Sequence, residues 1–212
     1  MPRKTVTPPE THRFDYDRFY RVGEGFRRSA VRVKPRARGV DAYALTRGEL
    51  RPRRALVFDH AEGTKLFDLI GTTLAVIRIV SDRFVAALEG FSGWRTFPVE
   101  LHDAKGDVVD GYHGLSATGR SGTIDDALSP VEVLPPAAPG GSALPHLVGL
   151  RFDPDTWDGS DVFAPAGMGF VFVTADVRDA LVAAKVTNVD LERITEITML
   201  VLDDDGDDEP FA

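Results

Sequence analysis

One local plan occurs twice in the chain: Val80-Ser81-Asp82-Arg83-Phe84-Val85-Ala86-Ala87-Leu88 and, 93 residues further on, Val173-Thr174-Ala175-Asp176-Val177-Arg178-Asp179-Ala180-Leu181. In each copy a β-branched apolar residue and a hydroxyl residue precede a stretch with the apolar spacing of a short amphipathic helix. The side-chain oxygen of Ser81 or Thr174 can accept a free amide at the helix start, worth about 1 kcal/mol. Because the flanking sequences do not match, we interpret this repeated sequence pattern as one strand-to-helix joint used twice, not as two duplicated halves.

Further strands are expected where short runs of alternating or β-branched apolar residues occur. These runs lie at 30–33, 43–45, 55–58, 74–80, 147–152, 170–173 and 197–202. Helical spacing of apolar residues is found at 64–70, 82–89 and 176–185. The sequence therefore predicts an α+β fold with a mixed or mainly antiparallel sheet, a few short helices and more strand than helix.

Charge and composition divide the chain into three parts. Residues 1–60 hold 15 basic and 7 acidic side chains, and we expect this basic region to pack on the main body. Residues 61–202 are predicted to form the α+β domain, with a loop rich in proline and glycine at 135–145. Residues 203–212 form an acidic tail, which supplies most of the net charge of −8.

The composition excludes several classes of protein. A chain without cysteine has no disulfide framework, no thiolate metal site and no cysteine nucleophile. The N-terminus lacks the apolar stretch of a secretory signal, and Arg78 interrupts the longest apolar run. We therefore expect a cytoplasmic protein that does not insert into a membrane.

No familiar metal or nucleotide motif fits. The acidic run Asp153, Asp155, Asp158 and Asp161 misses the ligand spacing of a calcium-binding EF-hand loop, so we interpret it as turns capped by aspartate side chains. The acidic tail fails the same test, and the stretches around Gly23 and Gly63 lack the glycine pattern of phosphate-binding loops. We expect no metal, no cofactor and no catalytic residue.

Two alternatives remain open. His113 follows Tyr112 and lies near Asp110, which is the pairing of a base with an orienting carboxylate, so an enzyme or small-ligand site near His113 is one alternative. Asp125 and Asp126 could supply acid–base groups to such a site. The other alternative is nucleic-acid binding through the N-terminal arginines, with Phe14, Tyr16, Phe19 and Tyr20 as stacking rings. The acidic balance and the absence of a recognised module argue against nucleic acid as a partner.

Aromatic residues near the C-terminal end are expected in the core. Phe152, Trp157, Phe163 and Phe170 are interspersed with strand signals, and rings in that setting usually pack together. We predict that they hold the C-terminal part of the chain together.

Two blocks of residues carry a resemblance to a known family. The first block comprises Ile79-Val80-Ser81-Asp82-Arg83-Phe84 with Leu88, Phe97-Pro98-Val99, Tyr112-His113-Gly114-Leu115, Asp125 and Asp126. The second comprises Phe152-Asp153, Trp157-Asp158-Gly159, Asp161-Val162-Phe163, Phe172-Val173-Thr174 through Leu181, and Thr187-Asn188. Together they resemble an immunity-protein family of bacterial polymorphic toxin systems, over about residues 66–197.

The resemblance implies an α+β protein that binds and blocks a secreted toxin inside the cell that produces it. It implies no catalytic residues and supplies no set of contact residues. An inhibitor needs a complementary surface of about 1,600 Å² of total buried area rather than reactive groups. From charge alone we expect the tail residues to speed the association with a toxin if that toxin is basic. These residues are Asp203, Asp204, Asp205, Asp207, Asp208 and Glu209.

Overall fold

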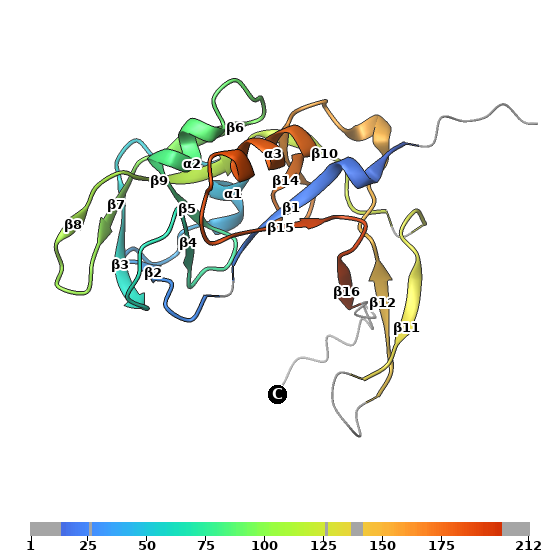
Figure 1. Ribbon diagram of the computed structural model, residues 1–212, viewed down its shortest axis with the longest axis horizontal. Coiled ribbons are helices and arrows are strands. Elements are labelled where there is room, and N and C mark those ends of the chain that lie inside the picture. The colour runs from blue at the N-terminus through green and yellow to red at the C-terminus, as the bar shows by residue number, and fades with distance from the viewer. Residues whose placement is uncertain (1–13, 26, 126, 137–141, 201–212) are drawn as a thin grey trace, which may run out of the picture.

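The computed structural model describes residues 14–25, 27–125, 127–136 and 142–200 (Figure 1). Strands make up 40% of the chain and helices 14%, and the strands form three sheets with both parallel and antiparallel pairs. The predicted α+β class is therefore confirmed. Among the described residues, no helix is both long enough and apolar enough to cross a membrane.

The largest sheet has eight strands. Their order is β6 (Trp94–Phe97), β9 (Tyr112–Ala117), β5 (Arg78–Ser81), β4 (Leu69–Thr72), β2 (Arg32–Pro35), β3 (Leu56–Glu62), β7 (Val99–His102) and β8 (Val108–Val109). Its central strands have an apolar core on each face, because neighbouring residues of one strand point to opposite sides. Leu69 and Val80 belong to one core cluster, and Ile70 and Ile79 belong to the other.

The five-stranded sheet joins the first strand of the described chain to strands from the C-terminal part. Its order is β10 (Gly119–Ser121), β13 (Val162–Pro165), β14 (Phe172–Thr174), β1 (Phe19–Glu24) and β15 (Val189–Arg193). β1 pairs antiparallel with β14 on one side and with β15 on the other. A strand from the basic N-terminal region therefore lies between two strands from the C-terminal part.

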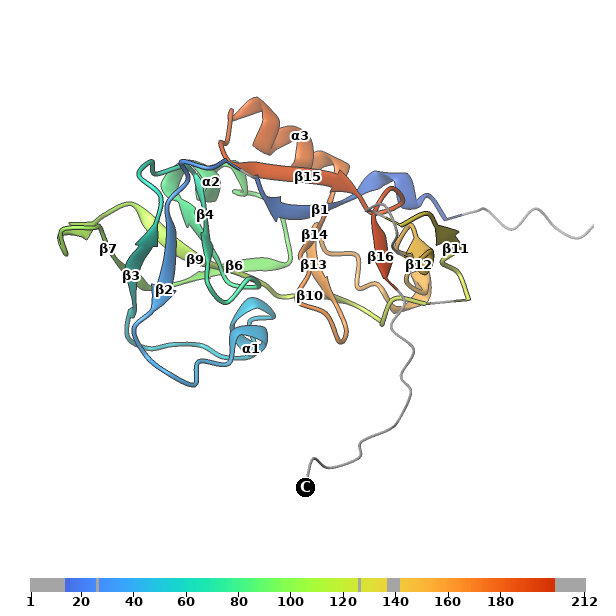
Figure 2. The same cartoon turned by 90° about the horizontal axis from the view of Figure 1, so that it is seen from below.

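The third sheet is small and projects from the body. It consists of β11 (Val131–Leu134), β12 (Leu144–Val148) and β16 (Thr198–Leu200), in that order and all antiparallel. In Figures 1 and 2 these strands lie at one end of the molecule, at the far end from β7. Both β11 and β16 are edge strands within the described residues.

The strand-to-helix joint occurs twice, as predicted. β5 leads directly into α2 (Asp82–Ala87), and β14 leads directly into α3 (Ala175–Ala183). The two helices contact each other and bury their apolar faces in the same core cluster. Figure 2 shows α3 and the remaining helix, α1 (Ala42–Thr46), on opposite sides of the sheets.

The two joints differ in their caps. Ser81 Oγ accepts a hydrogen bond from the Phe84 amide at 3.3 Å, as expected for a cap. Thr174 makes no side-chain cap bond, and its hydroxyl is buried without a partner among the described residues. The cap prediction is therefore confirmed for Ser81 and wrong for Thr174.

Asp68 ties the two joints together. It lies just before β4, and its Oδ1 accepts a bond from Ser81 Oγ at 2.7 Å. Its Oδ2 accepts bonds from the amide and the hydroxyl of Thr187, at 2.9 and 2.6 Å. Burial alone would raise the pKa of Asp68, but the hydrogen bonds from Thr187 and Ser81 hold the pKa below its usual value. The carboxylate thus links the end of β5 to the segment that follows α3.

The aromatic cluster predicted from the sequence is present. Phe152 and Phe163 are buried and pack edge to face, with Trp157 and Phe170 partly buried against the same cluster. Phe19 of β1 lies in the middle of this cluster. Two short 3-10 helices, Tyr16–Arg18 and Pro154–Thr156, lie next to ring residues of this cluster in the sequence.

Two secondary-structure predictions were wrong. The run 43–45 is not a strand but the middle of α1, because the Asp41 side chain caps the Ala44 amide at 2.9 Å and starts a helix. The run 64–70 is not a helix, because Leu69–Thr72 pairs with both β2 and β5 as a central strand. A strand buried on both faces has a continuous apolar run, which periodicity does not separate from a short helix. Two further predicted strands are only partly correct, because the run 74–80 forms a strand only from Arg78 onward and the run 147–152 only as far as Val148.

Candidate functional site

His113 lies at the surface and pairs with a residue that the sequence did not suggest. It is on β9, and its Nε2 lies 2.7 Å from Oδ1 of Asp82, the first residue of α2. Asp110 is not its partner. The side chain of Tyr112 lies on the opposite face of β9 from His113, and its hydroxyl donates to the Phe67 carbonyl at 3.0 Å. His113 lines none of the four best-formed cavities in the described part of the chain.

The other acidic candidates act in turns. Asp125 accepts the Ala127 amide at 2.8 Å, and Asp126 lies outside the described residues. Asp153 caps a 3-10 helix, Asp158 accepts the Arg120 and Ser160 amides, and Asp161 accepts from Ser92. The interpretation of the acidic run as capped turns therefore holds for Asp153 and Asp158, whereas Asp161 bonds to Ser92, 69 residues away in the chain. The described residues contain no group of three or more His, Cys, Asp or Glu that could hold a metal ion.

The N-terminal rings are not free for stacking on bases. Phe19 and Tyr20 are buried, and Phe14 and Tyr16 pack edge to face on Phe152. The guanidinium of Arg18 lies over the Phe19 ring at 5.3 Å from its centroid. The rings of this region therefore serve the core, and the nucleic-acid alternative has no stacking platform here.

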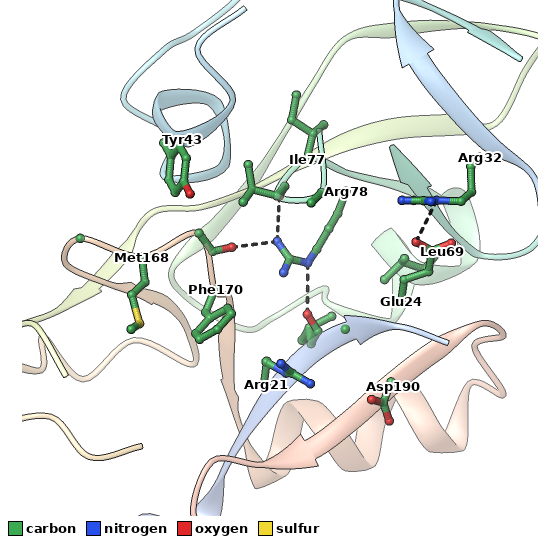
Figure 3. Close-up of a pocket in the computed structure, with 17 residues that line it drawn as sticks. Arg21, Glu24, Arg32, Tyr43, Leu69, Ile77, Arg78, Met168, Phe170 and Asp190 are labelled. Atoms are coloured by element: carbon green, nitrogen blue, oxygen red, sulfur yellow. Dashed lines mark hydrogen bonds and ion pairs between the residues drawn. The ribbon is translucent and has the colours of Figure 1, made fainter. Parts of the chain in front are cut away.

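A cavity of about 530 Å³ lies between the two main sheets. We call it the Arg78 pocket. Its floor comes from β1, β4 and β5, its side from Asp190 on β15, and its rim from Tyr43 of α1 and the segment 167–170 (Figure 3). Charged and apolar side chains share the lining. They include Arg21, Glu24, Arg32, Arg78, Leu69, Ile77, Met168 and Phe170.

Arg78 is a buried cation without a carboxylate partner among the described residues. Its Nε donates to the Val22 carbonyl at 3.1 Å, and its Nη1 donates to the carbonyls of Val76 and Gly169 at 2.9 and 3.4 Å. Within the described residues the hydrogen bonds of Arg78 come from Nε and Nη1 alone, and Nη2 makes none (Figure 3). Burial and the nearby charge of Arg21 lower the Arg78 pKa to about 10, so the side chain stays charged at neutral pH.

Three other charged side chains of the pocket form ion pairs. Arg21 pairs with Glu192 at 2.5 Å, and Arg32 lies 3.6 Å from Glu24. Burial raises the pKa of Glu24, an effect that the Arg32 charge opposes. The Glu24 carboxyl packs directly on Gly71, where a Cβ atom would lie 1.8 Å from Oε2.

One feature of the sequence hints at this pocket, namely the charge of Arg78 inside an apolar run. Its significance depends on carbonyls that lie 56 and 91 residues away in the chain. Such contacts leave no local pattern in the sequence, so the pocket was not predicted.

A second surface of interest is the projecting sheet of β11, β12 and β16. Val133 is 70% exposed and Val131 54% exposed, and both lie on the edge strand β11. Leu144 and Leu200, on the other two strands, are exposed as well. Exposed apolar side chains gathered on an unpaired edge are typical of a surface that binds another protein.

The predicted contact residues Asp203 to Glu209 lie outside the described residues. They follow β16 in the sequence, since Leu200 is its last residue. In the sequence, two residues, 201 and 202, separate the acidic tail from the last strand of the projecting sheet.

Comparison with known proteins identifies the class of this chain. The model of the immunity protein family Imm11 matches residues 7–196 of the 212, which is most of the chain. The chain belongs to the Imm11 family of immunity proteins. The match confirms the resemblance and extends it into the basic N-terminal region, and it indicates an immunity function against a toxin. No curated protein matches the chain.

Proposed function

We propose that this protein binds a cognate secreted toxin and neutralises it, by occluding the toxin active site or by locking an inactive shape. The observation that carries the proposal is the Imm11 family match over residues 7–196. In this proposal the protein acts in the cytoplasm of the producing cell, as the antidote of a polymorphic toxin system used in contact-dependent competition.

The geometry of the described residues supports binding rather than catalysis. The pairing of His113 with Asp82 is on the surface, outside the pockets. The projecting sheet offers an apolar edge strand, and a partner strand can add to such an edge through main-chain hydrogen bonds. We therefore infer that the toxin docks on β11, with Val131 and Val133 as apolar contacts.

The acidic tail has a separate role in this proposal. The tail follows β16 in the sequence, so two residues join its charges to the sheet that carries the inferred contact surface. Opposite charge on the toxin would speed encounter without adding much to the final contacts. We propose that residues 203–209 act in this way.

Growth rescue tests the proposal and the contact surface together. The toxin domain encoded beside this protein is expressed in a bacterial host with the wild-type chain or with a variant. We expect wild type to restore growth and the double change Val131→Lys and Val133→Lys to abolish rescue, because two buried charges at an interface cost several kcal/mol.

The matched control is Val182→Lys, since Val182 is 60% exposed on α3, away from β11. It should rescue like wild type. If the β11 variant folds and still rescues growth, the contact surface is wrong. If wild type neither rescues growth nor co-elutes with the toxin, the immunity function is wrong.

A further inference from the structure

The Arg78 pocket contains an unused hydrogen-bond donor on a buried cation. Three carbonyl oxygens hold the Nε and Nη1 atoms of Arg78, which fixes the plane of the guanidinium. The Nη2 group is left facing the cavity without a partner among the described residues (Figure 3). Nη2 is not enclosed by protein but keeps contact with the open cavity, so an acceptor that enters the cavity can take a charge-assisted hydrogen bond from it.

The surroundings favour an acceptor that carries charge. Arg21 also lines the cavity, and it lies near enough to Arg78 to lower its pKa. The Nε of Arg21 is buried without a hydrogen-bond partner, while its Nη2 pairs with Glu192. Two guanidinium groups that face one cavity are the usual means of binding a carboxylate or a phosphate.

The other residues that line the cavity favour a carboxylate over a phosphate. Glu24 and Asp190 line the same cavity, and their negative charges would repel a doubly charged phosphate more strongly than a carboxylate. Tyr43, Met168 and Phe170 form an apolar wall, against which the rest of an organic acid can pack. The volume of about 530 Å³ falls within the usual range for small-molecule sites.

We propose that the Arg78 pocket binds an organic monocarboxylate. The carboxylate accepts from Nη2 of Arg78 and from Arg21, and the apolar part of the ligand lies against Phe170, Met168 and Tyr43. The site is distinct from the projecting sheet and does not depend on the immunity function.

A matched pair of probes tests the proposal on the purified full-length chain. The probes are 3-phenylpropionate and its neutral amide, 3-phenylpropanamide, with inorganic phosphate as a third ligand. Binding is followed by titration of the arginine Nε–Hε NMR signals. With 11 heavy atoms, 3-phenylpropionate is expected to bind with a Kd of about 1–10 mM, and the amide at least about tenfold more weakly.

Variants locate the site. Arg21→Gln should weaken carboxylate binding by about tenfold, since one charge-assisted contact is lost. Tyr43→Glu, at an exposed rim position, should weaken it by charge repulsion while the buried lining stays intact. Arg38→Gln removes the same charge at an exposed position that does not line the cavity, and it should leave the Kd unchanged. These variants keep Arg78, so the test does not depend on whether a change at Arg78 allows folding.

The carboxylate can be free or can belong to the toxin, and a second arm separates these sources. Exclusion of 3-phenylpropionate from the complex of this protein with its toxin would identify a carboxylate of the toxin as the natural occupant. An unchanged Kd in the complex would identify a free acid. Either result requires binding to the isolated chain. Equal binding of acid and amide, tighter binding of phosphate, or no saturation of the acid by roughly 50 mM would overturn the proposal.

Discussion

Ser81 and Thr174 hold the same position in the two joints but differ in their hydrogen bonds. Ser81 caps the Phe84 amide and donates to Asp68, whereas the Thr174 hydroxyl is buried without a partner among the described residues. We expect Ser81→Ala to lower the free energy of unfolding by about 1–2 kcal/mol. Thr174→Val should be neutral or slightly stabilising, because it removes an unpaired buried hydroxyl. Urea unfolding at pH 7 measures both changes, and a larger loss for Thr174→Val would contradict this account.

Gly63 and Gly90 offer a matched test of close packing at the residue scale. Both have a positive φ, +81° and +88°, so alanine is strained at either position by about 1–2 kcal/mol. A Cβ at Gly63 would also lie 1.9 Å from the Ala30 carbonyl oxygen, whereas at Gly90 it would meet nothing within 4 Å. We expect Gly63→Ala to cost roughly 2 kcal/mol more than Gly90→Ala in thermal or urea unfolding. Equal losses in the free energy of unfolding would show that residues 28–31 can move to accommodate the added methyl group without measurable cost.

At the scale of elements, Asp68 is the residue through which the two joints depend on each other. Asp68→Asn removes one charged acceptor of the bonds from Ser81 and Thr187, so we expect a loss of about 2 kcal/mol at pH 7. The native pKa of Asp68 lies below its ordinary value of 3.8. The contribution of the carboxylate is therefore complete well above pH 3.8 and is lost as the pH falls through the native pKa.

Urea unfolding of wild type and Asp68→Asn between pH 7 and pH 2.5 tests this dependence. The difference in the free energy of unfolding should shrink below about pH 4. Glu89→Gln, an exposed position at the end of the same joint, should cost nothing measurable at any pH. A difference that stays constant down to pH 2.5 would mean that the Asp68 carboxylate does not stabilise the fold.

The elements that were predicted correctly are those with local signals. The helices at 82–87 and 175–183 follow a strand and a hydroxyl residue, and their apolar faces repeat with helical spacing. The stretch around Tyr43 was mistaken for a strand because three residues carry no period, and the cap at Asp41 decided its structure. The Arg78 pocket and the exposed edge of β11 depend on which distant strands pair, which a single sequence does not reveal.

At the scale of the whole molecule, the basic N-terminal region and the C-terminal part share one sheet. β1 pairs with β14 and β15, and Phe19 packs among rings from the C-terminal part. We propose that residues 1–60 and 61–202 fold as a single unit. In urea unfolding, Trp94 and Trp157 fluorescence and far-ultraviolet circular dichroism should then report one shared transition. Two separate midpoints would indicate independent domains.

The tail gives a prediction about rates. Replacing Asp203, Asp204, Asp205, Asp207, Asp208 and Glu209 by Ser should slow association with the toxin by about tenfold at low salt. At about 0.5 M salt the difference should nearly vanish, because screening removes long-range attraction. The dissociation rate should stay the same. Stopped-flow binding measures both rates, and an unchanged association rate at low salt would rule out steering by the tail.

The central claim is that this protein neutralises a toxin by forming a stable complex with it. The most direct test is to titrate the activity of the purified toxin encoded beside it with increasing amounts of this protein. The account predicts that activity falls linearly to zero at one equivalent. Complete loss of toxin activity at a small fraction of an equivalent would reveal catalysis, and full activity at a large excess would show that the toxin is not its partner.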